Sequence, residues 1–308
     1  MPIAVTAMLP IILLIATGWT LNRKKVISAE GWNAMDKLGY YLLFPATLFN
    51  NVSTADFNAL DVGTYAATLY STLGTLCVLL ILLQPLLKKS LSVTGPAFSS
   101  IFQGSVRWNA FIVMGIAGTV WGKSGLAITA ITMALLIPVI NVITITMMTV
   151  YASGKAISVK AILLGICKNP FIIAISAGLV LNLGGVEVPQ TISTYVNFLG
   201  RAAVPLALLC IGASMDLDAL RKPGPRLIFG SVMRLAIAPA VALLFAHLYG
   251  LDDLAKGLVV LVFAVPTAAS AFVLAKQMGG DSKLMAELLA LQAVLAAFTL
   301  TLWLLVIG

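Results

Sequence analysis

The sequence is poor in charge. Only 10% of its 308 residues are Asp, Glu, Lys or Arg, while 60% are hydrophobic, and the mean hydropathy is +1.05. Soluble domains carry about 25% charged residues, so this chain has too little polar surface to cover a soluble fold of its size. The composition excludes a soluble globular protein and predicts an all-α polytopic membrane protein.

Side chains that carry catalytic or metal chemistry are equally scarce. There is one histidine, His247, and the three cysteines (Cys77, Cys167 and Cys210) have no paired spacing. We interpret the cysteines as small hydrophobic residues and the histidine as an ordinary residue near a span end. No two aspartates fall within an apolar span, and no metalloenzyme motif is present. We therefore predict that the protein is not an enzyme and holds no metal or cofactor.

Apolar windows of about 20 residues, the length that crosses the hydrocarbon core of a bilayer, recur along the chain. The first window is followed rather than preceded by basic residues, which favours a retained helix over a cleaved signal peptide. With Gly, Pro and charged residues as boundaries, the windows give ten predicted spans: 3–21, 33–51, 63–87, 95–115, 123–151, 169–185, 189–215, 226–249, 254–277 and 284–307.

Most basic residues lie in the loops after odd-numbered spans, and few lie in the loops after even-numbered spans. The loops after even spans carry Lys123 and Lys256 together with several acids. This asymmetry predicts that the loops after odd spans are cytoplasmic and that both termini are outside. Because the net charge of +8 lies in short loops rather than on a soluble module, we expect no nucleic-acid partner. Thirteen of the 19 basic residues follow odd spans: Arg23, Lys24, Lys25, Lys88, Lys89, Lys155, Lys160, Lys168, Arg221, Lys222, Arg226, Lys276 and Lys283.

Similar patterns recur five spans apart. "LGYYLLFPATLFNNVS" in span 2 resembles "LGRAAVPLALLCIGAS" in span 7, and Asn109-Ala110-Phe111 in span 4 aligns with Ser270-Ala271-Phe272 in span 9. Because five is odd, the second set enters the membrane from the opposite side, which is the inverted repeat of secondary transporters. We predict a first repeat at 1–152, a cytoplasmic linker at 153–168 and a second repeat at 169–308.

Spans 4 and 9 carry the polar chemistry. A guanidinium at mid-membrane depth, such as that of Arg107, costs at least about 2.5 kcal/mol, so a partner, a water-filled cavity or a ligand must offset it. Pro266 removes a backbone donor and predicts a break in span 9, whereas a break in span 4 would rest on Gly104 and its polar neighbours. Half-helix N-termini attract anions, and Arg107 suits a carboxylate. The candidate substrate-binding residues are Gln103, Ser105, Arg107, Asn109, Asn141, Pro266, Thr267 and Ser270.

The sequence resembles the auxin efflux carrier family, whose bacterial members are described as malonate or malate permeases. The resemblance covers essentially the whole chain, and its most specific parts are "KNPFIIAISAGLVLN", "FLGRAAVPLALLCIGASM" and "AVPTAASAFVLAKQMGGD". It implies a ten-helix fold related to the sodium/bile-acid symporters, in the bacterial inner membrane. Broken helices 4 and 9 would cross in a transport domain of helices 3–5 and 8–10, on a scaffold of helices 1, 2, 6 and 7.

The resemblance also implies elevator-type transport of a small organic acid, with a homodimer formed through the scaffold helices. Asn109, Pro266 and Thr267 match the family's carboxylate site near the crossing. Span 4 lacks the proline that plant members carry there. Alternatives are a sodium-coupled symporter of amphipathic anions, or a receptor that kept the fold without transporting.

Several polar residues allow two interpretations. Arg107 binds substrate, or it snorkels to an interface or pairs with Glu287. Glu287 is the carboxylate offered by the transport-domain spans and a candidate for proton coupling. We interpret Arg201 and Arg234 as snorkelling or scaffold residues, and Asn141 and Gln292 as cavity-lining or interhelical hydrogen-bonding residues.

Overall fold

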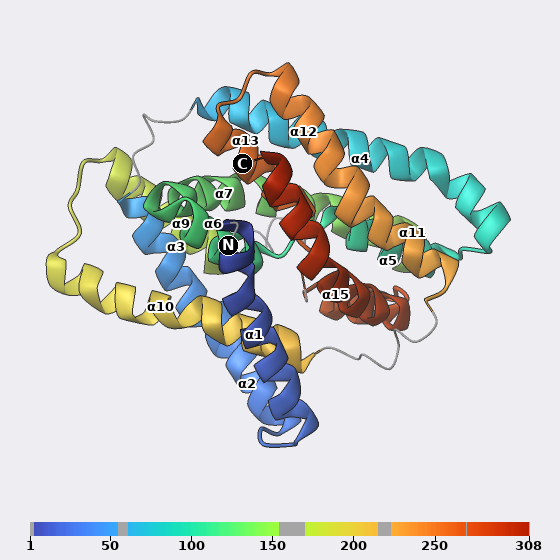
Figure 1. Ribbon diagram of the computed structural model, residues 1–308, viewed down its shortest axis with the longest axis horizontal. Helices are drawn as coiled ribbons and strands as arrows, with labels where there is room; N and C mark the ends of the chain where they lie inside the picture. The colour runs from blue at the N-terminus through green and yellow to red at the C-terminus, as the bar shows by residue number, and fades with distance from the viewer. Residues whose placement is uncertain (1–2, 55–60, 154–169, 215–222, 269, 308) are drawn as a thin grey trace. The chain divides into compact units, whose positions relative to one another are not determined.

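The computed structural model describes residues 3–54, 61–153, 170–214, 223–268 and 270–307 (Figure 1). Within these ranges the chain is helical and contains no strand. The predicted linker 153–168 lies outside them except for Ser153, and so does Cys167. The first half of the chain forms α1 (Ile3–Arg23), α2 (Ala29–Leu38), η1 (Gly39–Leu43), α3 (Phe44–Ser53), α4 (Val62–Leu91), α5 (Gly95–Val106), α6 (Ala110–Val120), α7 (Gly122–Met148) and η3 (Thr149–Ser153), where η marks a π-helical turn.

The second half continues the same all-helical pattern. Its elements are α9 (Pro170–Leu183), α10 (Gln190–Ala213), α11 (Pro225–Val232), η5 (Met233–Ile237), α12 (Ala238–Leu248), α13 (Asp253–Ala264), α14 (Ser270–Met278) and α15 (Ser282–Ile307). Each predicted span therefore coincides with a helix or with a run of helices. The number of spans and their inverted arrangement stay predictions.

Among the described residues, five helical runs are long and apolar enough to cross a membrane: Val62–Leu91, Gly122–Ala152, Gln190–Ala213, Pro225–Leu248 and Ser282–Ile307. Predicted spans 4 and 9 fall short for a structural reason, because each is divided into two helices of 12 residues or fewer. The described part of span 6 is a shorter apolar helix. The protein is thus a multi-pass membrane protein in which two apolar stretches are interrupted.

The helices group into two compact units, each assembled from separated parts of the chain. Unit 1 comprises Met1–Leu60, Phe111–Pro138 and Val159–Ser214. Unit 2 comprises Asp61–Ala110, Val139–Ser158 and Met215–Gly308. Each unit draws on both predicted repeats, so packing does not follow the order of the chain.

In unit 1, α1 packs against α10, and Figure 1 shows the two helices crossing. Their backbones touch at two glycines. A Cβ atom on Gly18 would overlap the carbonyl oxygen of Leu209, and one on Gly212 would overlap that of Ile15. The Asn22 side-chain amide donates to the Ala213 carbonyl at 2.8 Å beside this contact. Small residues that let backbones approach are a common basis of helix packing in membranes.

This contact predicts a sharp response to a single methyl group. Gly18→Ala and Gly212→Ala are each expected to destabilise unit 1 by about 1–3 kcal/mol, because the helices must separate to admit the methyl. Thermal unfolding of the purified protein in detergent measures the effect. The control is Gly74→Ala on α4, where an added Cβ meets nothing within 4 Å. Equal melting temperatures for Gly18→Ala and Gly74→Ala would contradict the close packing.

In unit 2, two short helices begin at side-chain caps. The Thr94 hydroxyl accepts from the Ala97 amide at 3.4 Å at the start of α5, and the Asp252 carboxylate accepts from the Ala255 amide at 2.8 Å at the start of α13. Such caps satisfy amide groups that a helix start leaves unpaired. They fix where each helix begins.

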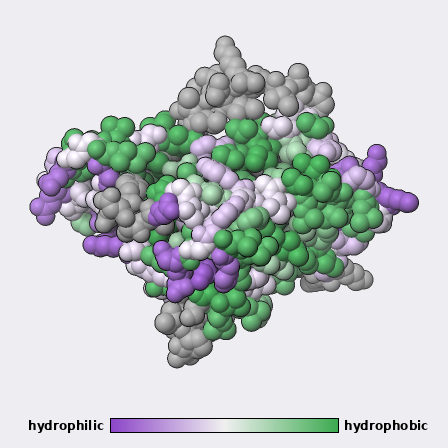
Figure 2. Space-filling view, turned by 90° about the horizontal axis from the view of Figure 1, so that it is seen from above, coloured by the Kyte–Doolittle hydropathy of each residue, from purple (hydrophilic) through white to green (hydrophobic). Residues whose placement is uncertain are grey.

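Many large apolar side chains lie on the surface. Figure 2 shows hydrophobic residues over much of the visible face. Leu82, Leu183, Phe298 and Leu302 are each more than 60% exposed. Contiguous exposure of this kind is unfavourable in water but not in lipid, which agrees with the membrane-protein class predicted from composition.

Candidate functional site

Predicted spans 4 and 9 are both interrupted. In span 4, α5 ends at Val106 and α6 begins at Ala110, with Arg107 extended at φ −72° and ψ 149°. In span 9, α13 ends at Ala264 and α14 begins at Ser270, with Val265 extended at φ −69° and ψ 153°. The break in span 9 falls at Pro266, as predicted. Span 4 breaks without a proline, within its polar run, at Arg107 to Asn109.

The two interruptions meet in unit 2. The backbone N–H of Asn109 donates to the Pro266 carbonyl at 3.0 Å. Both residues are buried. This bond gives the Asn109 N–H and the Pro266 carbonyl a partner where helical bonding stops, as a break inside a membrane requires. Two of the residues predicted to bind substrate are therefore in contact.

Gln292 on α15 connects the same interruptions and is completely buried. Its side-chain oxygen accepts from the Thr267 N–H at 2.9 Å. Its side-chain nitrogen donates to the Gly104 carbonyl at 2.9 Å and to the Gly230 carbonyl at 3.4 Å. Of the two interpretations given for Gln292, the structure shows the hydrogen-bonding one: a single amide bonds to α5, to α11 and to the segment between α13 and α14.

The Arg107 guanidinium is half-buried and bonds within unit 2. It donates to the Asn141 side-chain oxygen on α7 at 2.6 Å and to the Gln103 side-chain oxygen on α5 at 3.3 Å. Gln103 is itself held by Met148, whose sulfur lies 2.9 Å from the amide nitrogen. Amide oxygens orient a guanidinium without removing its charge. We call Gln103, Arg107 and Asn141 the arginine cluster.

The other predicted residues have varied positions. Ser105 is buried, and its hydroxyl donates to the Ile101 carbonyl of its own helix at 2.8 Å. The Thr267 hydroxyl lies 3.5 Å from the Gln103 carbonyl. Ser270 is exposed at the start of α14, and Glu287 is half-buried on α15. Their roles in substrate binding and proton coupling stay predictions.

Arg234 corrects one interpretation made from the sequence. It does not snorkel, because its side chain is 0% exposed. Its Nε donates to Val265 at 2.6 Å, Nη2 to Val262 at 2.6 Å and Nη1 to Ser105 at 3.4 Å, all through backbone carbonyls. A lone arginine in "SVMRLAIAPA" gives no local sign of such distant acceptors. Arg201, by contrast, is exposed.

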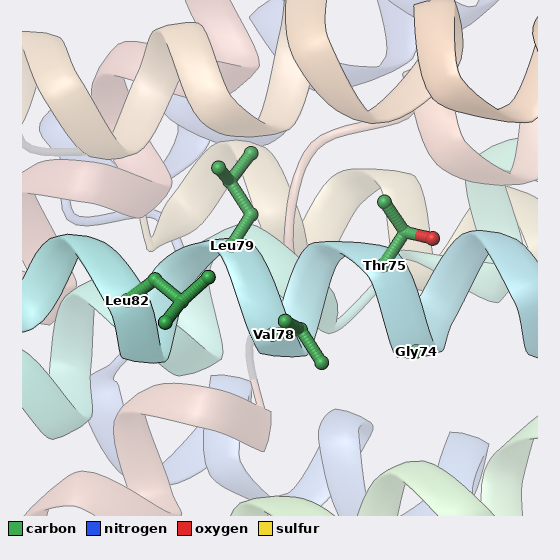
Figure 3. A pocket seen from close by; sticks show the side chains of 5 residues that line it. All are labelled: Gly74, Thr75, Val78, Leu79 and Leu82. Carbon is green, nitrogen blue, oxygen red and sulfur yellow. The ribbon is translucent and has the colours of Figure 1, made fainter.

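A surface hollow on α4 lies outside this region (Figure 3). It is lined by one face of that helix, at Gly74, Thr75, Val78, Leu79 and Leu82. Apart from the Thr75 hydroxyl its lining is apolar, so it offers no cation for an organic acid. Among the described residues, no group of three or more His, Cys, Asp or Glu side chains lies together to hold a metal.

A family model described as "Membrane transport protein" matches residues 3–304 of the chain. The chain belongs to this family. The finding confirms the assignment to the auxin efflux carrier family made from the sequence. It also makes the protein a membrane transporter by family, and its relatives carry transporter rather than enzyme names.

Three curated relatives of this transporter are similar over long stretches. A Rhizobium meliloti protein named "Putative malonate transporter" is 24% identical over 281 residues, which are 89% of this chain and 85% of that protein. An uncharacterized transporter of Methanothermobacter thermautotrophicus is 22% identical over 96% of this chain and 95% of its own. Another, from Methanocaldococcus jannaschii, is 26% identical over 47% of this chain and 48% of its own.

Proposed function

We propose that this transporter carries a small organic anion of the dicarboxylate class, with malonate as the probe of choice. The observation that carries the proposal is the arginine cluster beside the two interruptions, in which two amide oxygens orient the Arg107 guanidinium. The name of the Rhizobium meliloti relative supports the same substrate class.

The chemistry of the region suits a carboxylate. A guanidinium presents parallel N–H donors at the spacing of carboxylate oxygens, which gives both affinity and orientation. The first turn of α14 follows the interruption of span 9 at Ser270, and N-terminal helix ends favour anions. In the proposed site, Arg107 binds one carboxylate, with Asn109 and Thr267 beside it. Gln103 and Asn141 hold the guanidinium in place.

The proposed mechanism is elevator-type alternating access. The arginine cluster, Asn109, Pro266 and Thr267 all belong to unit 2, which supports a site that moves as one body. Helices 1, 2, 6 and 7 form the proposed scaffold and homodimer contact. We place the protein in the bacterial inner membrane with both termini outside, since thirteen of 19 basic residues lie in loops after odd spans.

Counterflow in proteoliposomes tests the proposed function. Vesicles loaded with unlabelled malonate are expected to accumulate radiolabelled malonate transiently, because a carrier exchanges substrate in both directions. Protein-free vesicles are the control. Binding without counterflow would identify a receptor on the same fold, and exchange that needs sodium would identify a sodium-coupled symporter. Neither binding nor exchange of malonate, succinate or other small mono- and dicarboxylates would contradict the proposal.

A further inference from the structure

Arg234 is a buried charge that the proposed site does not use. It lies in the π-helical turn η5, and its side chain is 0% exposed. Such a turn inserts one residue into a helix and is frequent at functional sites. A buried guanidinium is costly unless its N–H groups are bonded. The Arg234 guanidinium donates hydrogen bonds to three backbone carbonyls.

The three acceptors share one property: they lie at the C-terminal ends of the interrupted helices. Val262 is in the last turn of α13, and Val265 follows that helix directly. Ser105 is in the last turn of α5. Each C-terminal helix end carries about half a negative charge. One guanidinium therefore faces two negative helix ends and offsets about one elementary charge.

Without such a cation, the partial negative charge of these helix ends would repel an anion bound beside them. Converging carbonyl oxygens are the ligands by which proteins hold alkali and alkaline-earth cations. In unit 2, the carbonyls that converge at the two helix ends accept hydrogen bonds from the Arg234 guanidinium instead. Because this cation is part of the chain, it cannot dissociate from them.

We propose that Arg234 is a tethered cation that replaces a bound metal ion between the C-terminal ends of α5 and α13, so that anion binding requires no sodium. This inference rests on the proposed function, since it concerns the anion site. Arg234 is a positioning residue: it neutralises the helix ends, and Arg107 contacts the substrate.

The first experiment uses the wild-type protein. Malonate affinity, measured in detergent with sodium exchanged for choline, is expected to change by less than about twofold, because the cation is covalently attached. Arg234→Ala is expected to raise the malonate Kd by about tenfold or more, because a buried charge partner is lost. A sodium requirement in the wild type would overturn the proposal.

Chemical rescue separates a cation from a packing role. Guanidinium ion at low concentration is expected to restore part of the melting temperature and of the malonate affinity of Arg234→Ala. Urea, a neutral molecule of similar shape, is expected to restore neither. Arg201→Ala, which removes an exposed arginine, is the matched control and is expected to respond to neither compound. Equal effects of urea and guanidinium on Arg234→Ala would overturn the proposal.

Two further variants decide the matter if Arg234→Ala does not fold. Arg234→Lys keeps the charge and is expected to bind malonate without sodium, while Arg234→Gln keeps much of the length without the charge and is expected to bind more weakly than Arg234→Lys. Equal affinities would overturn the inference. Failure of the wild type to bind or exchange any carboxylate contradicts the proposed function alone, because the melting-temperature rescue uses no malonate and still tests Arg234.

Discussion

Replacing Arg107 by alanine is expected to raise the malonate Kd by about thirtyfold or more, since truncating one partner of a hydrogen-bonded charge pair costs about 2–5 kcal/mol. The protein should still insert and fold, because Arg107 is only half-buried and its guanidinium bonds to the side chains of Gln103 and Asn141. Asn109→Ala is expected to weaken binding in the same direction. Isothermal titration of the purified variants with malonate measures both.

Two controls make this result specific to the arginine cluster. Arg107→Lys keeps the charge but not the two parallel donors, so its affinity should fall between wild type and Arg107→Ala. Arg201→Ala removes an exposed cation in unit 1 and should leave affinity unchanged. Binding retained in both Arg107→Ala and Asn109→Ala, with a normal melting temperature, would remove the substrate site from this region.

Gln292→Leu is expected to destabilise the protein by about 2 kcal/mol or more, because it removes a buried hydrogen-bond partner at about 1–3 kcal/mol for each group left unpaired. The groups that lose the Gln292 amide are the Thr267 N–H and the Gly104 and Gly230 carbonyls, of which the Gly230 carbonyl still accepts from the Met233 N–H. Since two of them flank the interruptions, exchange of malonate should also fall. Thermal unfolding and counterflow measure the two effects.

The chemistry of Gln292 allows a sharper comparison. Gln292→Glu keeps the oxygen that accepts from the Thr267 N–H. It replaces the side-chain NH₂ group, which donates to the Gly104 and Gly230 carbonyls, with a second acceptor oxygen. It is expected to be no more stable than Gln292→Leu, because repulsion and burial of charge offset the bond that is kept. Gln190→Leu at the exposed start of α10 is the control. A Gln292→Leu variant as stable as Gln190→Leu would show that the amide does not hold the interruptions together.

The features that agree with the structure are those set by single residues or short stretches of the sequence. Composition alone gave the membrane class, because hydropathy is a property of each residue in turn. Pro266 marked the break in span 9, since a proline removes a donor wherever it stands. The break in span 4 was less visible. No proline is present, and the helix ends at Val106 because Asn109 donates its N–H to Pro266 from a distant part of the chain.

The sequence by itself determined the family, the all-helical membrane class and the residues Arg107, Asn109, Pro266 and Thr267 as one candidate region. Tertiary structure alone decided how its charges and amides are partnered. It buried Arg234, which was interpreted from the sequence as a snorkelling or scaffold residue, and it joined Gln292 to a glycine 188 residues away. The physical reason is that apolarity and backbone breaks are encoded locally, whereas a buried polar group finds its partners only when distant helices pack.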